Sequence, residues 1–259
     1  MPIRPALFAG TLLLAACTGS GTPGTDRGSV QAMSDEAFDQ QLREALMRNP
    51  QVIIDALEAY RSELAAQAAA ASEDVIRGAL PGLIAGDYGV AIGADADEAE
   101  IVIVEFFDYH CGFCRRALDE VIGILDERAG TRLVLQELPV LRDESRSAAL
   151  AALAAAELGT ETYRQAHLAM MRHGGLLDDA TVDDVLERAG VDAAAVRERL
   201  DGSDDALDER LEKSIELGRE IGVAGTPFFI IFNPNTGALQ LVEGYQAGTI
   251  EETVAEVLG

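Results

Sequence analysis

The sequence of 259 residues has no tryptophan, only three cysteines, and far fewer basic than acidic residues. The formal charge is −25, and no cluster of basic residues marks a surface for nucleic acid, so we expect no nucleic-acid partner. The folded part has only two cysteines, whereas a structural zinc site needs four ligands, and the neighbouring His110 cannot complete the set. We therefore expect neither a metal nor a cofactor.

A hydrophobic run long enough to cross a membrane is also missing at the N-terminus. The apolar stretch Ala6 to Ala16 is too short to span a bilayer, but it suits the hydrophobic region of an export signal, with Arg4 before it. It ends in Leu-Ala-Ala-Cys17, which resembles a bacterial lipobox, where the cysteine is lipidated after cleavage. We expect residues 1–16 to be a lipoprotein signal peptide and Cys17 to carry the lipid. An ordinary signal peptide cut nearby is the alternative.

These features predict a location in the cell envelope, lipid-anchored and facing the periplasm. By resemblance to Gram-negative lipoproteins, Thr18 after the lipidated cysteine indicates sorting to the outer membrane. Residues 17–33 are rich in Gly, Ser, Thr and Pro and are expected to form a flexible tether. An exported protein works in an oxidising compartment, where a dithiol can take part in disulfide chemistry.

Residues 34–86 are predicted to form a helical arm. Ser34 can cap a first helix that ends at Asn49-Pro50, where a second helix begins. The second helix has an apolar seam at coiled-coil spacing, formed by Ile53, Leu57, Tyr60 and Leu64. The helices either pack on their own domain or pair with copies from other chains. We favour self-association, because so short a seam buries little surface alone.

The segment between this arm and the next strand is apolar but rich in helix-breaking residues. It runs from Val75 to Ile84 and contains Gly78, Pro81 and Gly82. We interpret it as a connector or hinge.

A cysteine pair follows a strongly predicted buried strand. The residues from Ile101 to Phe107 are β-branched or aromatic, apart from Glu105. Cys111-Gly-Phe-Cys114 follows and opens a helical pattern. The N-terminus of a helix favours a thiolate, the attacking species in disulfide exchange. Cys111 is thus the candidate nucleophile and Cys114 the resolving thiol. A purely structural disulfide is the alternative, but so small a loop constrains the unfolded chain little.

The remaining pattern completes an α/β order of elements. A second buried strand spans Arg132 to Leu138, and helical patterns then run from about 143 to 222, each ending near a glycine. A hairpin follows Pro227, and Thr249-x-x-Glu252 is interpreted as a capping box that opens a last helix. This order predicts a thioredoxin fold with a helical insertion at about 143–222.

Four features together resemble the DsbA family of thiol:disulfide oxidoreductases. They are the stretch from Glu105 to Cys114, the segment Leu138 to Leu141, the helical insertion, and Gly-Thr226-Pro227. The resemblance covers the predicted domain at 87–259. The stretch Leu42 to Leu57 resembles ScsC-like members, in which it forms an oligomerising arm, so the expected homo-oligomer is a trimer or a dimer.

The resemblance implies roles for further site residues. Pro227 is expected to be cis and to face the cysteines, leaving the Thr226 backbone free to pair with an extended substrate strand. Glu105 is expected to assist proton transfer at the second cysteine. Gln136 stands at the position of the lysine that often accompanies this acid, so Glu105 has no evident cationic partner; a surface glutamate at a strand edge is the alternative. His110 is expected to stabilise the thiolate or to contact substrate.

Phe113 between the cysteines offers no hydrogen bond or charge to a thiolate. We expect a reduction potential between roughly −120 mV for DsbA and roughly −270 mV for thioredoxin. The predicted function is a thiol:disulfide isomerase or reductase acting on exported proteins with thiols or disulfides, reset by a membrane redox partner. Dithiol oxidase is the alternative within this chemistry.

A different class of function is a non-enzymatic lipoprotein that binds clients or copper. Soft ligands at helical spacing could hold copper(I): His167, Met170, Met171 and His173. Methionine on a helix, however, more often fills a core.

Overall fold

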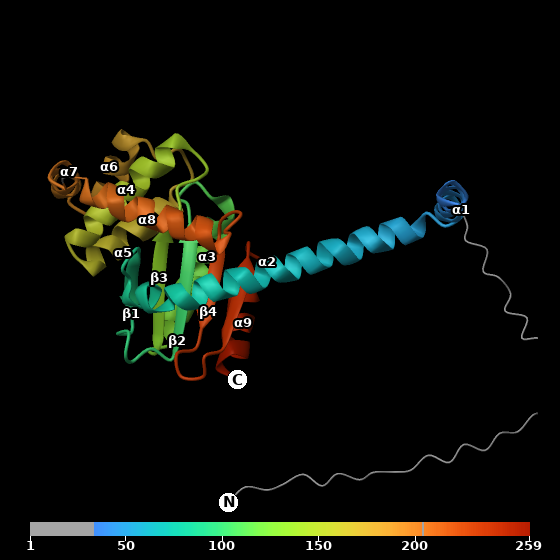
Figure 1. The fold of residues 1–259 in the computed structure, drawn as a ribbon. Helices are drawn as coiled ribbons and strands as arrows, with labels where there is room; N and C mark the ends of the chain where they lie inside the picture. Colours follow the sequence, from blue (N-terminus) through green and yellow to red (C-terminus); the bar gives the residue numbers. More distant parts are fainter. Residues whose placement is uncertain (1–33, 204) are drawn as a thin grey trace, which may run out of the picture. The chain divides into compact units, whose positions relative to one another are not determined.

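The computed structural model describes residues 34–203 and 205–259 (Figure 1). The predicted signal peptide, the lipidated Cys17 and the tether lie outside the described residues. The chain divides into two compact units whose boundary falls between Tyr60 and Arg61. The elements are α1 (Asp35–Arg48), α2 (Gln51–Ala85), β1 (Val90–Gly93), β2 (Ile101–Phe107), α3 (Gly112–Glu127), β3 (Thr131–Glu137), α4 (Asp143–Glu157), α5 (Thr160–Arg172), α6 (Asp179–Arg188), α7 (Ala193–Asp201), α8 (Ala206–Ile221), β4 (Phe228–Phe232), β5 (Leu239–Glu243) and α9 (Thr249–Leu258).

The second unit is built on a five-stranded mixed sheet in the order β1-β3-β2-β4-β5. Strands β2 and β3 are parallel, and the other neighbours are antiparallel. Every residue of β2 and β4 is buried, as expected for central strands of continuous apolar composition. The predicted thioredoxin fold with a helical insertion is confirmed.

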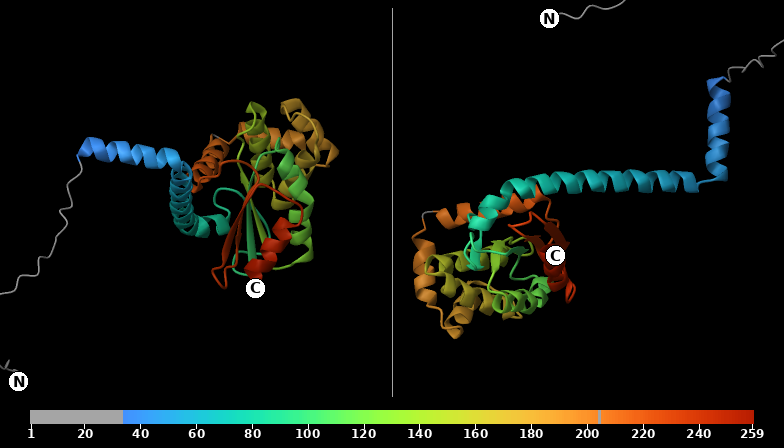
Figure 2. Two further views of the ribbon diagram at one scale, coloured as in Figure 1. Left: turned by 90° about the vertical axis from the view of Figure 1, so that its right-hand side faces the viewer. Right: turned by 90° about the horizontal axis from the view of Figure 1, so that it is seen from below.

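Alternate residues of β2 point to two separate cores. Ile101, Ile103 and Phe107 lie in the core shared with α3, α9 and the insertion helices. Val102, Val104 and Phe106 lie in the core on the opposite face, shared with α2 and α8. Figure 2 shows the helices on both sides of the sheet. Because side chains alternate along a strand, Glu105 belongs to the face that carries α3.

The last turns of α2 are part of the second unit, which contradicts the expected hinge at Val75–Ile84. The helix continues through Pro81 to Ala85. Ile76, Leu80 and Leu83 are buried against the sheet. Burial of these side chains stabilises the helix at residues whose helical propensity is poor. The arm predicted at 34–86 therefore overlaps the unit that carries the sheet.

The insertion spans α4 to α8, close to the predicted 143–222. The end of the chain differs from the expectation, because Thr249 does not cap α9. The N-cap is Gly248, without a side-chain cap bond. The carboxylate of Glu120, in α3, instead accepts hydrogen bonds from the amides of Gly248, Ile250 and Glu251 at 2.9–3.0 Å. A tertiary contact thus supplies the cap that the local motif suggested.

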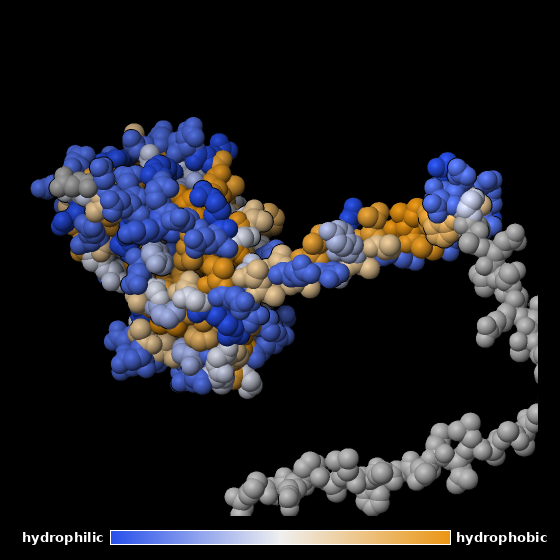
Figure 3. Space-filling view, viewed as in Figure 1, coloured by the Kyte–Doolittle hydropathy of each residue, from blue (hydrophilic) through white to orange (hydrophobic). Residues whose placement is uncertain are grey.

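The first unit contains α1 and the start of α2. Ser34 caps α1, as predicted, by accepting from the amide of Ala37. No residue of α1 is buried. Large apolar side chains of both helices remain about half exposed, among them Phe38, Leu57 and Tyr60. Figure 3 shows the resulting hydrophobic surface on α2.

Candidate active site

Cys111 is the N-cap residue of α3. Its Sγ accepts a hydrogen bond from the amide of Cys114 at 3.2 Å. The contact with the Cys114 thiol lowers the pKa of Cys111 to about 6, and the amides of Cys114 and Phe113 act in the same direction against burial. At neutral pH this sulfur is largely a thiolate, the form that attacks disulfides. Cys111 is only 4% exposed as a residue, so a client must approach it closely.

Cys114 has the opposite surroundings. It is fully buried in the core between α3 and the sheet. Burial raises its pKa, and the contact with Cys111 and the charge of Glu105 raise it further. The two sulfurs are therefore strongly unequal: one ionises readily, and the other keeps its proton until a base removes it.

Glu105 is a buried carboxyl group on the central strand. It is 2% exposed, and its Oε1 has no hydrogen-bond partner among the described residues. Burial, followed by the charge of Cys111, raises its pKa to about 8. These surroundings contradict the alternative of a surface glutamate at a strand edge. The same alternation of faces excludes Gln136 as its neighbour, because Glu105 pairs in register with Leu135. Gln136 instead lies 2.9 Å from Ser214 of α8.

The peptide bond between Thr226 and Pro227 is cis, as the resemblance predicted. The Thr226 carbonyl oxygen accepts a hydrogen bond from the protonated Cys111 Sγ at 3.2 Å. The thiolate has no proton to donate, so in that form this oxygen loses the bond. Beside it lies a hollow of about 380 Å³, lined by Phe113, residues 224–228, Glu243 and Gly244. Thr226, whose carbonyl oxygen lies 3.2 Å from Cys111 Sγ, is one of the lining residues, so the hollow lies close to this sulfur.

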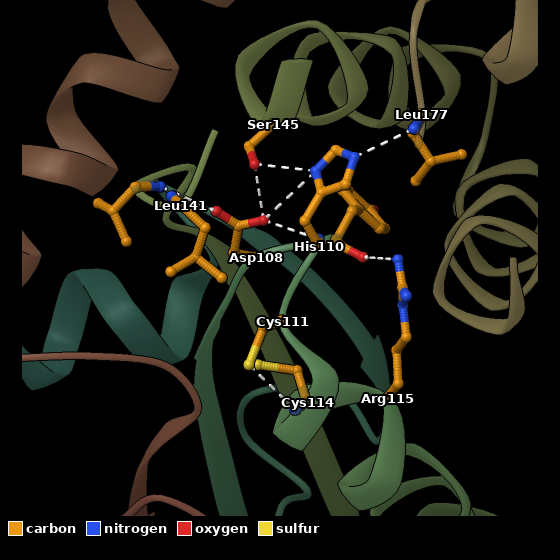
Figure 4. A network of polar contacts seen from close by, with 10 residues as sticks. Asp108, His110, Cys111, Cys114, Arg115, Leu141, Ser145 and Leu177 are labelled. Atoms are coloured by element: carbon orange, nitrogen blue, oxygen red, sulfur yellow. Dashed lines mark hydrogen bonds and ion pairs between the residues drawn. The ribbon is translucent and has the colours of Figure 1, made fainter. Parts of the chain in front are cut away.

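His110 does not contact Cys111. Figure 4 shows its ring directed toward the insertion, away from both sulfurs. The ring lies 2.9 Å from Ser145 Oγ and 3.0 Å from the amide of Leu177. Its pKa is lowered, chiefly by burial, so the ring is neutral near pH 7. The expected direct stabilisation of the thiolate is therefore not what this geometry provides.

The residues considered for copper have separate surroundings. His167 is buried, stacks on Tyr163, and lies 3.2 Å from the Tyr109 hydroxyl. Burial lowers the pKa of His167 to about 3. Met170 and Met171 fill the core, whereas His173 ends α5. In the part of the chain that the structure describes, no group of three or more His, Cys, Asp or Glu side chains could hold a metal ion.

Sequence reasoning missed two polar features near the cysteines. Asp108 connects the turn before Cys111 to neighbouring segments. Glu137 lies buried beneath it and accepts from the hydroxyls of Tyr109 and Tyr163 at 3.2 and 3.3 Å. The available signal was an acid at the end of a buried strand: Asp108 directly follows β2, and Glu137 is the last residue of β3. Their partners, however, come from distant segments.

A thioredoxin fold that places an ionisable cysteine at a helix N-terminus, opposite a cis-proline, defines the class of thiol:disulfide oxidoreductases. The family model of the DSBA-like thioredoxin domain matches residues 102–244, and the chain belongs to this family.

Comparisons with individual proteins agree with this assignment. A thioredoxin-like oxidoreductase from Silicibacter pomeroyi is 29% identical, with a TM-score of 0.58 over 67% of this chain and 94% of that one. ScsC of Proteus mirabilis, in a transitional conformation, shares the fold at 21% identity, with a TM-score of 0.61 over 86% of this chain and 96% of that one.

A match among curated proteins covers only a small part of the relative. The Na(+)/H(+) antiporter NhaA 3 of Salinispora tropica is 30% identical over 162 residues, which make up 60% of this chain and 24% of the antiporter. The chain thus spans about a quarter of the length of the curated relatives it matches.

Proposed function

We propose that this protein is an exported, lipid-anchored thiol:disulfide isomerase or reductase that acts on disulfides of cell-envelope proteins. The observation that carries the proposal is the inequality of the two sulfurs. Cys111 is held as a thiolate at the N-terminus of α3, and Cys114 is held as a buried thiol. Such a pair can attack a client disulfide with one sulfur and keep the other in reserve.

In the proposed cycle, the Cys111 thiolate attacks one sulfur of a client disulfide. A mixed disulfide forms, and the other client sulfur leaves as a thiolate. Glu105, when ionised, removes the proton of Cys114. The new thiolate attacks Cys111 Sγ, breaks the bond to the client and releases the second client sulfur as a thiolate. The enzyme is then oxidised to the Cys111–Cys114 disulfide, and the client has gained two electrons. A pKa of about 8 places Glu105 near the pH at which it must exchange a proton.

The direction of exchange is proposed from the residue between the cysteines. Phe113 is 53% exposed and contacts the guanidinium of Arg116, with 4.1 Å between Cζ and the ring centroid. It gives the Cys111 thiolate no side-chain hydrogen bond. We expect a potential between roughly −120 and −270 mV, which suits reduction or isomerisation more than oxidation. Equilibration with glutathione measures the potential, and a value at or above that of DsbA contradicts this direction.

Two activity assays separate the functions. The proposal predicts catalysed insulin reduction and recovery of activity from scrambled ribonuclease. Rapid oxidation of reduced ribonuclease without either activity supports the oxidase alternative. A Cys114→Ala variant should accumulate mixed disulfides through Cys111, and mass spectrometry then identifies the clients and the membrane redox partner that resets the dithiol.

The exposed apolar side chains of α1 and the start of α2 support a proposed homo-oligomer, a trimer or a dimer. A helix whose apolar residues remain exposed gains burial by pairing with another copy. Facing active sites in an oligomer would hold a misfolded client between them, which suits isomerase work. Sedimentation equilibrium on residues 18–259, with and without residues 34–60, tests this arm. A monomer in both cases contradicts it.

The anchor and the envelope location are proposed from residues 1–33. Within residues 34–203 and 205–259, no helix is long and apolar enough to cross a membrane. Attachment would then depend on lipid at Cys17. The lipid would hold the protein at the outer membrane, with its folded part facing the periplasm. Metabolic labelling with a palmitate analogue tests it: Cys17→Ser should lose the label, and an unchanged label contradicts the anchor.

A further inference from the structure

The turn before Cys111 contains a polar network that the exchange cycle does not use (Figure 4). Asp108 is 1% exposed, and its Oδ1 accepts from the His110 amide and from the Ser145 hydroxyl at 2.8 Å each. Its Oδ2 accepts from the amides of Val140 and Leu141 at 2.9 Å each. One carboxylate therefore joins the turn after β2 to the segment after β3 and to the first turn of α4.

The His110 ring extends this network to a third segment. Its Nε2 lies 3.0 Å from the amide of Leu177, which can only donate, so Nε2 must accept. The proton of the neutral ring is then on Nδ1, which donates to Ser145 Oγ at 2.9 Å. The Ser145 hydroxyl in turn donates to Asp108. Every bond in this chain has a defined direction, and the bond from the Leu177 amide requires a neutral ring with its proton on Nδ1.

Charged groups from three segments surround this ring. Asp108, from the end of β2, and Glu144, in α4, favour its protonation. Arg115, in α3, and Arg142, the N-cap residue of α4, disfavour it. Burial is the largest effect and lowers the pKa of His110, since the His110 side chain is 4% exposed. The neutral ring that the bonds require is thus also the form that the surroundings favour.

We propose that His110 is a positioning residue whose neutral ring, with Asp108 and Ser145, latches the turn carrying Cys111 to the helical insertion. We call these three residues the redox-turn latch. The inference rests on the proposed function, because it concerns how the nucleophile is held. Cys111 follows His110 directly and caps α3 only while its backbone stays extended, with φ −76° and ψ 113°. Loosening the latch frees this backbone and weakens the bond from the Cys114 amide to the sulfur.

The latch is sensitive to acid. A protonated ring carries hydrogen on both nitrogens, so Nε2 can no longer accept from Leu177. The bond from the Leu177 amide is lost as the pH falls through the pKa of His110, whereas the bond to Ser145 remains. The backbone at Cys111 is then held less firmly, at a pH where the protonated fraction of the Cys111 thiol is also rising.

Three variants separate the bonds of the latch. His110→Ala removes both ring contacts. Ser145→Ala removes the contact with His110 Nδ1 and the link to Asp108, but leaves the bond from the Leu177 amide to the ring. His110→Gln places an amide oxygen where it can accept from Leu177, and this side chain does not titrate. His173→Gln is the matched control, since His173 ends α5 and belongs to neither the latch nor the cysteine site.

The first measurement is the rate of iodoacetamide alkylation of Cys111 in the reduced protein, as a function of pH. We expect His110→Ala to raise the thiol pKa by about half a unit to one unit, which slows alkylation at pH 5 by about threefold to tenfold. Ser145→Ala should shift the pKa in the same direction but less. His110→Gln should be restored toward the wild type, and His173→Gln should match it.

The second measurement follows the Leu177 amide by NMR. In the wild type its chemical shift should titrate together with the His110 ring, whereas in His110→Gln it should not. Loss of packing alone would lower stability without changing the alkylation pH profile of Cys111 or the NMR titration of the Leu177 amide. The latch is wrong if the alkylation profile of His110→Ala superimposes on that of the wild type. It is equally wrong if His110→Gln has the same alkylation profile as His110→Ala. It is also wrong if the Leu177 amide shift does not titrate with the His110 ring.

These results remain distinct from a failure of the proposed function. Alkylation reports on the sulfur without any client. A wild-type Cys111 that titrates like free cysteine overturns the exchange function, and the latch with it. A lowered wild-type pKa with active insulin reduction, but no effect of the variants, overturns the latch alone. If His110→Ala fails to fold, Ser145→Ala decides the question.

Discussion

The two units of this chain treat apolar side chains in opposite ways. In the unit from Arg61 to Gly259, aliphatic and aromatic residues fill two cores, and the chemistry depends on that burial: it raises the pKa of Glu105 and of Cys114. In the unit that ends at Tyr60, residues of the same kind remain about half exposed. One unit thus buries its apolar side chains within a single chain, whereas the exposed apolar side chains of the other form the surface proposed to pair with a copy. The predictions below test whether the two are independent.

Removal of the nucleophile should have the largest effect. Cys111→Ala should reduce insulin reduction to the rate without enzyme, since Cys114 is buried and keeps its proton. Sedimentation should be unchanged. Residual activity well above background would show that Cys114 can act as the attacking sulfur.

A charge on the arm should change the oligomeric state and leave the chemistry of Cys111 unchanged. Leu57→Asp places a carboxylate in the predicted seam, where burial of a leucine contributes about 1.5–3 kcal/mol per chain. The oligomer should dissociate at least about tenfold more readily by sedimentation equilibrium, and the alkylation pKa of Cys111 should not change. Glu58→Gln, one position away from the seam, is the matched control. A change in the thiol pKa on dissociation would show that the two units are coupled.

Glu105→Gln should slow the resolving step and leave the first attack intact. General base catalysis typically contributes about 10²–10⁴-fold, so we expect mixed disulfides to resolve at least about tenfold more slowly. Stopped-flow mixing with a fluorescent disulfide peptide separates the two steps. Resolution at the normal rate would remove Glu105 from the mechanism.

The same substitution should change how stability depends on pH. The unfolded carboxyl ionises around pH 4.5, but the folded group keeps its proton up to about pH 8. Its contribution to stability is therefore fully present below pH 4.5 and is lost as the pH rises through 8. Between pH 4.5 and 7 the wild type should lose about 3 kcal/mol relative to Glu105→Gln. Urea denaturation at both pH values measures this difference, and parallel changes in the two proteins would contradict the raised pKa.

Glu120→Gln should have the smallest effect. Burial alone would raise the pKa of Glu120, but the amides of Glu251 and Gly248, with the Tyr245 hydroxyl, lower it, so the group is charged. Loss of that charge at the N-terminus of α9 should cost about 1 kcal/mol. Thermal unfolding measures the change, with Glu256→Gln, near the end of the same helix, as the control. Equal effects of both substitutions would show that the cap contributes nothing.

The sequence was most informative where local pattern and tertiary contact agree. Continuous apolar strands, the position of the cysteine pair and glycine-terminated helices all follow from neighbouring residues, and the fold was predicted from them. The hinge predicted from Pro81 was wrong, because the helix through Pro81 is stabilised by the burial of Ile76 and Leu83 on the sheet. The capping box predicted at Thr249 was wrong, because the carboxylate of Glu120, in another helix, accepts hydrogen bonds from the amides at the start of α9.

The site was predictable in its sulfurs but not in its surroundings. Cys111, Cys114 and Pro227 lie on motifs of a few residues. The partners of His110 lie 35 and 67 positions further along the chain, so no local pattern shows that its ring turns away from the sulfur. The face on which Glu105 lies was computable from strand alternation, but its pairing with Leu135 depends on the register between two strands.

The carboxylate of Glu120 has one more consequence. It joins helix α3, which carries Phe113, to Tyr245 and Gly248; Tyr245 directly follows Glu243 and Gly244, which line the same hollow as Phe113. Two segments that line the hollow are thereby connected through the hydrogen bonds of one carboxylate. We expect the hollow to keep its shape when a polypeptide enters, so the polypeptide must adapt its own conformation.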